Sequence, residues 1–287
     1  MSASTPKCAV LHCLSDVSCR PLHAHFRRAL SHVERTQTRF LLRLLRKNAQ
    51  TRFGREHRFD SLRSVPAFRR SIPVSSYEDY VPWIEAIAAG EDAVLTRERI
   101  SLFQPTSGTE AGTKHIPYCA ALRRSFVQGI APWLVALGSR SPGVFRGPWY
   151  WSISPPTTQR QMRGGLPVGF DDDTTYLGPF GRRLHRCLLA VPADVSAETD
   201  ADSFRNATLA HLLWQRNLAM ISVWSPTFLT TLVQHLEEHW SDVLDALAHL
   251  GGDGPQRARE VASLRRSRSV DNVLRSIWPK LSLISCW

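Results

Sequence analysis

The sequence predicts an α/β fold with mixed sheets flanked by helices. Short apolar runs typical of strands alternate along the chain with segments whose apolar residues recur at helical spacing. The 287 residues are 43% hydrophobic and 21% charged, which is typical of folded globular proteins. No apolar run approaches the roughly 18 residues that span a membrane, and the N-terminus lacks a secretory signal. We therefore expect a soluble, cytoplasmic protein without membrane association.

The first part of the chain carries the net charge of +11. Residues 1–70 contain 15 Lys and Arg against 4 Asp and Glu, and the remainder of the chain is balanced. Residues 1–20 are expected to form a poorly ordered leader, and helical spacing predicts a helix from Leu22 to Lys47 with arginines on its outer face. A solvated helix face is the preferred explanation of this charge, because no nucleic-acid recognition motif accompanies it. We expect no nucleic-acid partner.

The other elements follow from strand-like runs, helical periodicity and caps. In chain order the patterns predict a loop over residues 48–59, helices over 65–70 and 80–87, strands over 100–103 and 115–118, a helix over 120–137, a strand over 149–153, a helix over 204–218, a strand over 219–224, a helix over 225–247, a basic helix after Gly252, a helix over 270–277, and a strand over 280–287. Gly129 and Pro132 are expected to bend or split their helix. The last run reads as a buried strand of a sheet that is cut short. We expect the chain to self-associate through the exposed edge.

The turn over residues 106–114 is the sharpest signal for a ligand. Its candidate phosphate-binding residues are Thr106, Ser107, Gly108, Thr109, Gly112 and Lys114. The glycines let backbone N–H groups turn toward an anion, the hydroxyl groups can donate hydrogen bonds, and the lysine adds a positive charge. The spacing does not match the P-loop of nucleotide hydrolases. From these residues alone, a plain turn between strands is about as well supported as a phosphate site.

The segment FQPTSGTEAGTKHIPY, residues 103–118, resembles the phosphate-loop motif of the adenylate-forming superfamily, most closely that of the GH3 family of acyl-acid amido synthetases. Further segments that resemble the family lie, in the same order, at residues 48–54, 73–80, 164–167, 221–229 and 278–281. The resemblance covers residues 35–287. It implies an incomplete N-terminal ATP-binding domain of a GH3-like enzyme over residues 21–287, with the C-terminal domain absent.

The resemblance also implies a reaction. An ATP-dependent acid–amido synthetase, with ATP and Mg²⁺ as cofactors, adenylates a carboxylic acid and transfers the acyl group to an amino acid. The six turn residues named above would bind the ATP phosphates. No residue is assigned a catalytic role, and we expect this chain alone to be inactive because later segments of the family's site are missing. The alternative is a non-catalytic fragment whose basic N-terminal lobe binds an anionic partner.

Two other groups of residues could hold a metal ion, but neither predicts a metal site. The run from Asp171 to Asp173 is better explained as a solvated acidic turn, and the pair His235 and His239 has no third ligand at a suitable spacing. The six cysteines form no CxxC motif, so we expect free thiols in a reducing compartment.

Overall fold

The computed structural model describes residues 5–106, 114–152, 161–169, 181, 183, 186–198, 200–265 and 270–286. The chain divides into two compact units, where a single domain over residues 21–287 was the expectation. The parallel-sheet unit consists of Met1–Pro21, Ile130–Gln159 and Asp171–Trp287, and the mixed-sheet unit of Leu22–Gly129 and Arg160–Phe170. In the part of the chain that the structure describes, no helix is both long and apolar enough to cross a membrane.

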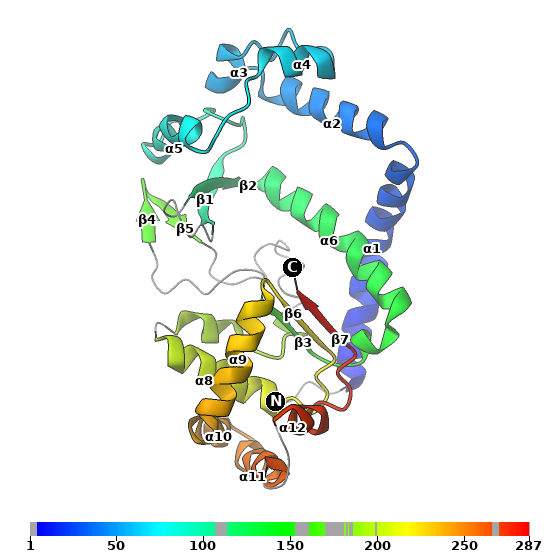
Figure 1. The fold of residues 1–287 in the computed structure, drawn as a ribbon. Helices are drawn as coiled ribbons and strands as arrows, with labels where there is room; N and C mark the ends of the chain where they lie inside the picture. Colours follow the sequence, from blue (N-terminus) through cyan, green and yellow to red (C-terminus); the bar gives the residue numbers. More distant parts are fainter. Residues whose placement is uncertain are drawn as a thin grey trace. The chain divides into compact units, whose positions relative to one another are not determined.

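The mixed-sheet unit contains a four-stranded sheet, which lies beside α5 (Val81–Ala88) (Figure 1). Its strands are β1 (Ile100–Pro105), β2 (His115–Cys119), β4 (Gln161–Arg163) and β5 (Leu166–Val168), in the order β2-β1-β5-β4. Strand β1 is antiparallel to β2 and parallel to β5. Phe103 of β1 is fully buried against Ile84 and Ile87 of α5 (Val81–Ala88). The predicted start of this helix is confirmed in part, because the Asp79 carboxylate accepts the Ser76 backbone N–H at 2.7 Å.

Three further helices form a second small core in the mixed-sheet unit. They are α2 (Val33–Asn48), α3 (Arg52–Glu56) and α4 (Val65–Ser71), and they bury Leu45, Phe59 and Leu62. Helix α3 lies inside the predicted loop over residues 48–59. It forms because the Thr51 hydroxyl accepts the Gly54 backbone N–H at 2.9 Å and so caps its first turn.

The N-terminal segment differs most from its prediction. Residues 5–20 are helical instead of a poorly ordered leader, since α1 extends over Thr5–Leu30 and a break at residues 31–32 separates it from α2. The reason is a narrow face on which Cys8 and His12, one helical turn apart, are both fully buried. The ring centroid of His12 lies 4.4 Å from that of Trp149, so packing onto a distant strand stabilises a helix with a weak local signal.

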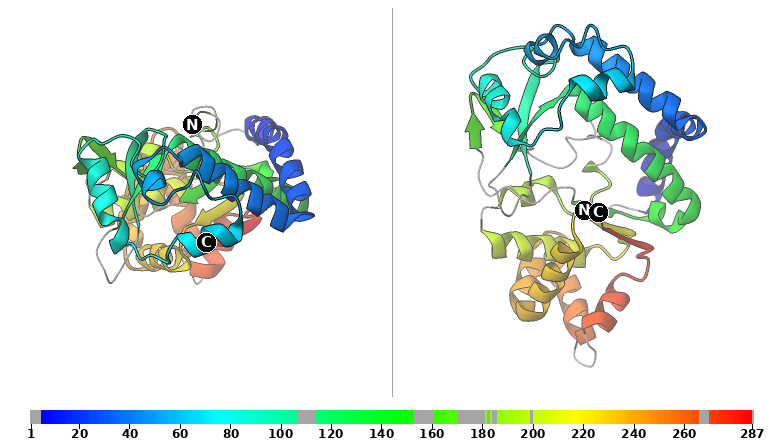
Figure 2. Two further views of the ribbon diagram at one scale, coloured as in Figure 1. Left: turned by 90° about the horizontal axis from the view of Figure 1, so that it is seen from above. Right: turned by 45° about the horizontal axis from the view of Figure 1, so that its top comes forward.

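Three parallel strands form the sheet of the parallel-sheet unit, in the order β3 (Trp149–Ser152), β6 (Met220–Val223) and β7 (Leu283–Cys286). One face is covered by helices α8 (Ala201–Trp214), α9 (Pro226–Glu238), α10 (Trp240–His249), α11 (Gly254–Arg265) and α12 (Val270–Ile277) (Figure 2). On the other face, His12 of α1 contacts Trp149, and Trp133 of α6 (Ala120–Arg140) lies 6.1 Å from Trp151 between ring centroids. The predicted α/β class with mixed sheets and flanking helices is confirmed.

Some element boundaries differ from the predictions. The helix expected over residues 225–247 is divided at His239 into α9 and α10, whereas α6 is one helix despite Gly129 and Pro132. Strand β7 is not buried as expected. It alternates half-buried and exposed residues, and Ile284 is 54% exposed, because among the described strands β7 pairs only with β6 and lies at the sheet edge.

Candidate functional site

Strands β1 and β2 hold the base of the predicted phosphate-binding turn. Their antiparallel ladder runs to the pair Pro105 and His115, and the Thr106 backbone N–H then donates to the Lys114 carbonyl at 2.9 Å. Thr106 and Lys114 therefore face each other where the turn begins and ends. Their predicted partners Ser107, Gly108, Thr109 and Gly112 lie outside the described residues, so their role stays a prediction.

Tyr77, which precedes α5 in the sequence, forms hydrogen bonds with the backbone of His115 at the base of the turn. Its hydroxyl accepts the His115 backbone N–H at 2.8 Å and donates to the His115 carbonyl at 3.4 Å. The Lys114 Nζ lies 5.4 Å from the centroid of the Tyr77 ring, within range of a cation–π interaction. No sequence pattern indicated a role for Tyr77, although it lies in the family-like segment at residues 73–80.

Arg163 of β4 supplies a second positive charge beside the turn. Its guanidinium contacts the His115 Nδ1, forms an ion pair with the Glu85 carboxylate and lies 5.6 Å from the Phe103 ring centroid. Burial, and secondarily the charge of Arg163, lower the pKa of His115, so the imidazole is neutral at pH 7. A neutral Nδ1 can accept a hydrogen bond from Arg163, which explains how the two groups tolerate contact.

These side chains are of the types that bind phosphate groups. Lys114 and Arg163 are cations, and the Thr106 hydroxyl can donate a hydrogen bond, which are the groups that bind phosphate oxygens. For a metal ion, the described residues hold no group of three His, Cys, Asp or Glu that could bind one. The run at Asp171–Asp173 lies outside the described residues.

The two histidines of α9 and its C-terminus that were weighed as metal ligands contact each other and neighbouring side chains. His235 and His239 stack with ring centroids 4.4 Å apart. The His235 Nε2 lies 2.8 Å from the Asn206 Oδ1, and the His239 Nδ1 lies 3.4 Å from the Asp242 Oδ2. These contacts are those of ordinary helix side chains.

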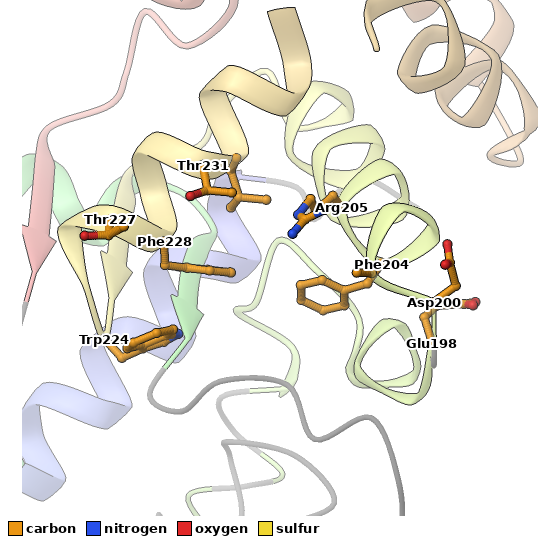
Figure 3. A pocket seen from close by; sticks show the side chains of 10 residues that line it. Glu198, Asp200, Phe204, Arg205, Trp224, Thr227, Phe228 and Thr231 are labelled. Atoms are coloured by element: carbon orange, nitrogen blue, oxygen red, sulfur yellow. The ribbon is translucent and has the colours of Figure 1, made fainter. Parts of the chain in front are cut away.

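A pocket of about 290 Å³ lies in the parallel-sheet unit, beyond the carboxyl end of β6 (Figure 3). Phe204 and Arg205 of α8 line one side, and Trp224 and Phe228 of the β6–α9 connection and α9 line the other. No sequence pattern predicted this pocket. The sequence feature that could have indicated it is Trp224, which lies between the end of β6 and Ser225, the N-cap of α9.

Comparisons with known proteins find similarity to one family over most of the chain. The family model described as GH3 family N-terminal domain matches residues 22–287. The putative indole-3-acetic acid-amido synthetase GH3.10 of Oryza sativa subsp. japonica is 33% identical over 261 residues, which cover 89% of this chain and 53% of that protein. The indole-3-acetic acid-amido synthetase GH3.6 of Arabidopsis thaliana is 22% identical over 274 residues, 86% of this chain and 44% of that protein.

The structural comparison supports the same fold. The AtGH3.15 acyl acid amido synthetase in complex with 2,4-DB superposes with a TM-score of 0.76 at 21% identity, covering 95% of this chain and 50% of that one. A second structure, of GH3.15 acyl acid amido synthetase, gives a TM-score of 0.72 at 19% identity. This chain spans about half the length of GH3.10 and of the GH3.15 structure.

Proposed function

The chain belongs to the GH3 family, and from this membership we propose that it is the phosphate-binding part of an ATP-dependent acid–amido synthetase. A carboxylate oxygen of the acid attacks the α-phosphorus of ATP, and the bond to the leaving pyrophosphate breaks. The amine of an amino acid then attacks the acyl carbon, AMP leaves, and the amine loses a proton. The relatives' names specify indole-3-acetic acid as their acid; for this chain we propose a small carboxylic acid and an amino acid.

The base of the turn is the observation that carries this proposal. Thr106 and Lys114 are held opposite each other by a backbone hydrogen bond, with the lysine ammonium against the Tyr77 ring. Lys114 and Arg163 would neutralise charge on the phosphates, and a Mg²⁺ ion bound to ATP would add to this effect. The chemistry needs no protein nucleophile, because the substrate carboxylate attacks; alignment and charge neutralisation are the protein's tasks.

Mg-ATP binding to the full chain, measured by isothermal titration calorimetry, tests the proposal. We expect saturable binding that Lys114→Gln weakens at least about tenfold, equivalent to about 1.4 kcal/mol. The matched control is Lys280→Gln, which removes an exposed lysine in the parallel-sheet unit. No saturable binding, or equal affinity in the Lys114 and Lys280 variants, would contradict the proposal.

We also propose a cytoplasmic location. All six cysteines, including the exposed Cys13, Cys187 and Cys286, are free thiols. Proteins of oxidising compartments commonly pair such residues, whereas the cytosol keeps them reduced.

A second candidate function, binding to an anionic partner, is favoured by the basic face of α2. Arg35, Arg39, Arg43 and Arg46 are exposed and lie on one side of this helix, and none forms an ion pair with another described residue. Retention on heparin that falls steeply with salt, and that a combined Arg39→Gln and Arg43→Gln variant loses, would support it. Retention equal in the variant and the parent chain would exclude this face as the binding surface.

A further inference from the structure

Helix α2 carries an exposed apolar row in addition to its exposed arginines. Its inner side packs on α4, and Leu45 is buried there (Figure 1). On the outer side, Val33, Phe40 and Leu44 are 48%, 56% and 45% exposed. Phe40 and Leu44 are one helical turn apart and Val33 lies two turns before Phe40, so the three side chains form one row along the helix. Such a row of large apolar side chains in water indicates an interaction surface.

The arginines lie directly beside this row. Arg43 is three residues after Phe40, a spacing that makes two side chains neighbours on the surface of a helix. Arg39 lies one turn before Arg43, and both side chains are exposed and form no ion pair with another described residue. Lys47, in contrast, is paired with Glu98. Unpaired cations and apolar side chains therefore share one surface, the outer face of α2, which consists of Val33, Arg35, Arg39, Phe40, Arg43, Leu44 and Arg46.

The combination of charge and apolar surface distinguishes between possible anionic partners. A soluble polyanion would neutralise the arginines but would leave Phe40 and Leu44 in water. A helix of a partner protein is bound through apolar anchors three or four residues apart, but Gln37 occupies the position one turn before Phe40. A bilayer with anionic lipids meets both requirements, because its headgroups attract the arginines and its acyl chains accept apolar side chains without a fixed spacing.

We propose that the outer face of α2 docks on an anionic phospholipid surface, with Phe40 and Leu44 at the level of the acyl chains and the arginines on the headgroup phosphates. Arginine suits this role, because its planar guanidinium can donate paired hydrogen bonds to phosphate oxygens. The sequence-based expectation of no membrane association considered only a spanning run, and a helix that lies at the membrane surface needs none.

Co-sedimentation of the full chain with lipid vesicles tests the proposal. One preparation is pure phosphatidylcholine, and the other is an equimolar mixture of phosphatidylcholine and phosphatidylserine. We expect the chain to bind the mixed vesicles at least about tenfold more tightly than the neutral ones, because each arginine near an anionic surface adds to the attraction. Equal binding to the two preparations, or no binding to the mixed vesicles, would overturn the proposal.

A double variant tests the arginines. Arg39→Gln combined with Arg43→Gln should weaken binding to the mixed vesicles at least about tenfold. The matched control combines Arg259→Gln with Arg275→Gln, at exposed arginines of α11 and α12, and should bind as the parent chain does. An equal effect of the two double variants would show that binding follows the net charge alone, and this result would overturn the assignment to α2.

A single variant tests the apolar row. Phe40→Gln leaves the charge unchanged and keeps a good helix former, so it should weaken binding to the mixed vesicles several-fold and leave retention on heparin as it is. The matched control is Val74→Gln, at a fully exposed apolar residue outside α2, and should have no effect on either. Circular dichroism checks that each variant is folded. Unchanged vesicle binding in Phe40→Gln would overturn the proposal.

Soluble polyanions distinguish this inference from the function on which it rests, the binding of α2 to an anionic partner. Retention on heparin without binding to the mixed vesicles would overturn the lipid assignment alone. Binding to poly-L-glutamate as tight as binding to the mixed vesicles would favour an acidic protein and would also overturn it. No binding to vesicles, heparin or poly-L-glutamate would contradict both. None of these measurements depends on ATP or on the turn at residues 106–114.

Discussion

Protonation of His12 should destabilise the protein, because its imidazole is enclosed. The side chain is fully buried, its Nε2 lies 2.9 Å from the Gly147 carbonyl, and its ring stacks on Phe145 with centroids 5.2 Å apart. Burial lowers the pKa of His12 from 6.5 to about 4, and the hydrogen bond to the Gly147 carbonyl opposes this shift only in part. The folded protein therefore holds His12 neutral.

The sign and size of the effect follow from these two pKa values. Between pH 6.5 and pH 4 the unfolded chain binds the proton and the folded chain does not, so the free energy of unfolding falls as the pH falls. The stabilisation is complete above pH 6.5. At about 1.4 kcal/mol per pKa unit, the full loss amounts to about 3 kcal/mol, of which about 2 kcal/mol falls between pH 7 and pH 5.

Urea denaturation followed by circular dichroism at pH 7 and pH 5 measures this loss. In His12→Gln, whose amide can still donate to the Gly147 carbonyl, we expect the loss between the two pH values to shrink by about 2 kcal/mol. His32→Gln, at an exposed histidine before α2, should behave as the parent chain does. An equal loss in the parent and His12→Gln would refute the burial of His12 and the packing of α1 against Trp149.

Three further substitutions each test a structural feature within one of the two units. Arg257→Met removes a buried arginine that donates to backbone carbonyls in the last turns of α8 and α12. This substitution should lower the free energy of unfolding by about 3–5 kcal/mol, whereas Arg259→Met, at an exposed arginine, should lower it by less than about 0.5 kcal/mol. Equal urea midpoints of the two variants would contradict this prediction. Ile284→Lys places a charge on the edge strand β7 and should reduce the mass measured by light scattering, provided that the parent chain self-associates through this edge as we predict; a parent chain that is monomeric throughout would disprove that prediction. Gly164→Ala should be more destabilising than Gly165→Ala. Both glycines have a positive φ, but only at Gly164 would the added Cβ lie 1.5 Å from a backbone oxygen. Thermal denaturation of the two variants tests this, and an equal or lower melting temperature of Gly165→Ala would contradict it.

Local sequence signals predicted the elements whose stability is local. The strands expected at residues 100–103 and 115–118 became β1 and β2 with ends extended by at most two residues. Ser225 followed by Pro226 predicted the start of α9 correctly, because its hydroxyl accepts the Thr227 backbone N–H at 3.2 Å. In such cases the interaction that defines the boundary lies within a few residues of it.

The missed features depend on contacts between distant residues. Residues 5–20 lack a strong helical pattern, and α1 gains its packing from Gly147 and Trp149, far along the chain. At the turn, Lys114 was identifiable from a motif, but Tyr77 and Arg163, which both contact the adjacent His115, were not. The contacts that these two make with His115 join residues 38 and 48 positions apart, which no local pattern reports.

The proposed phosphate site begins where a strand ladder ends, and the reason lies in backbone hydrogen bonding. The ladder between β1 and β2 runs to the pair Pro105 and His115, and the Thr106 backbone N–H, the first after β1, is used by the Lys114 carbonyl. The ladder therefore holds Thr106 in place and leaves its exposed side chain available for binding. Substitutions that disturb the ladder should therefore weaken ligand binding without removing any group that contacts the ligand.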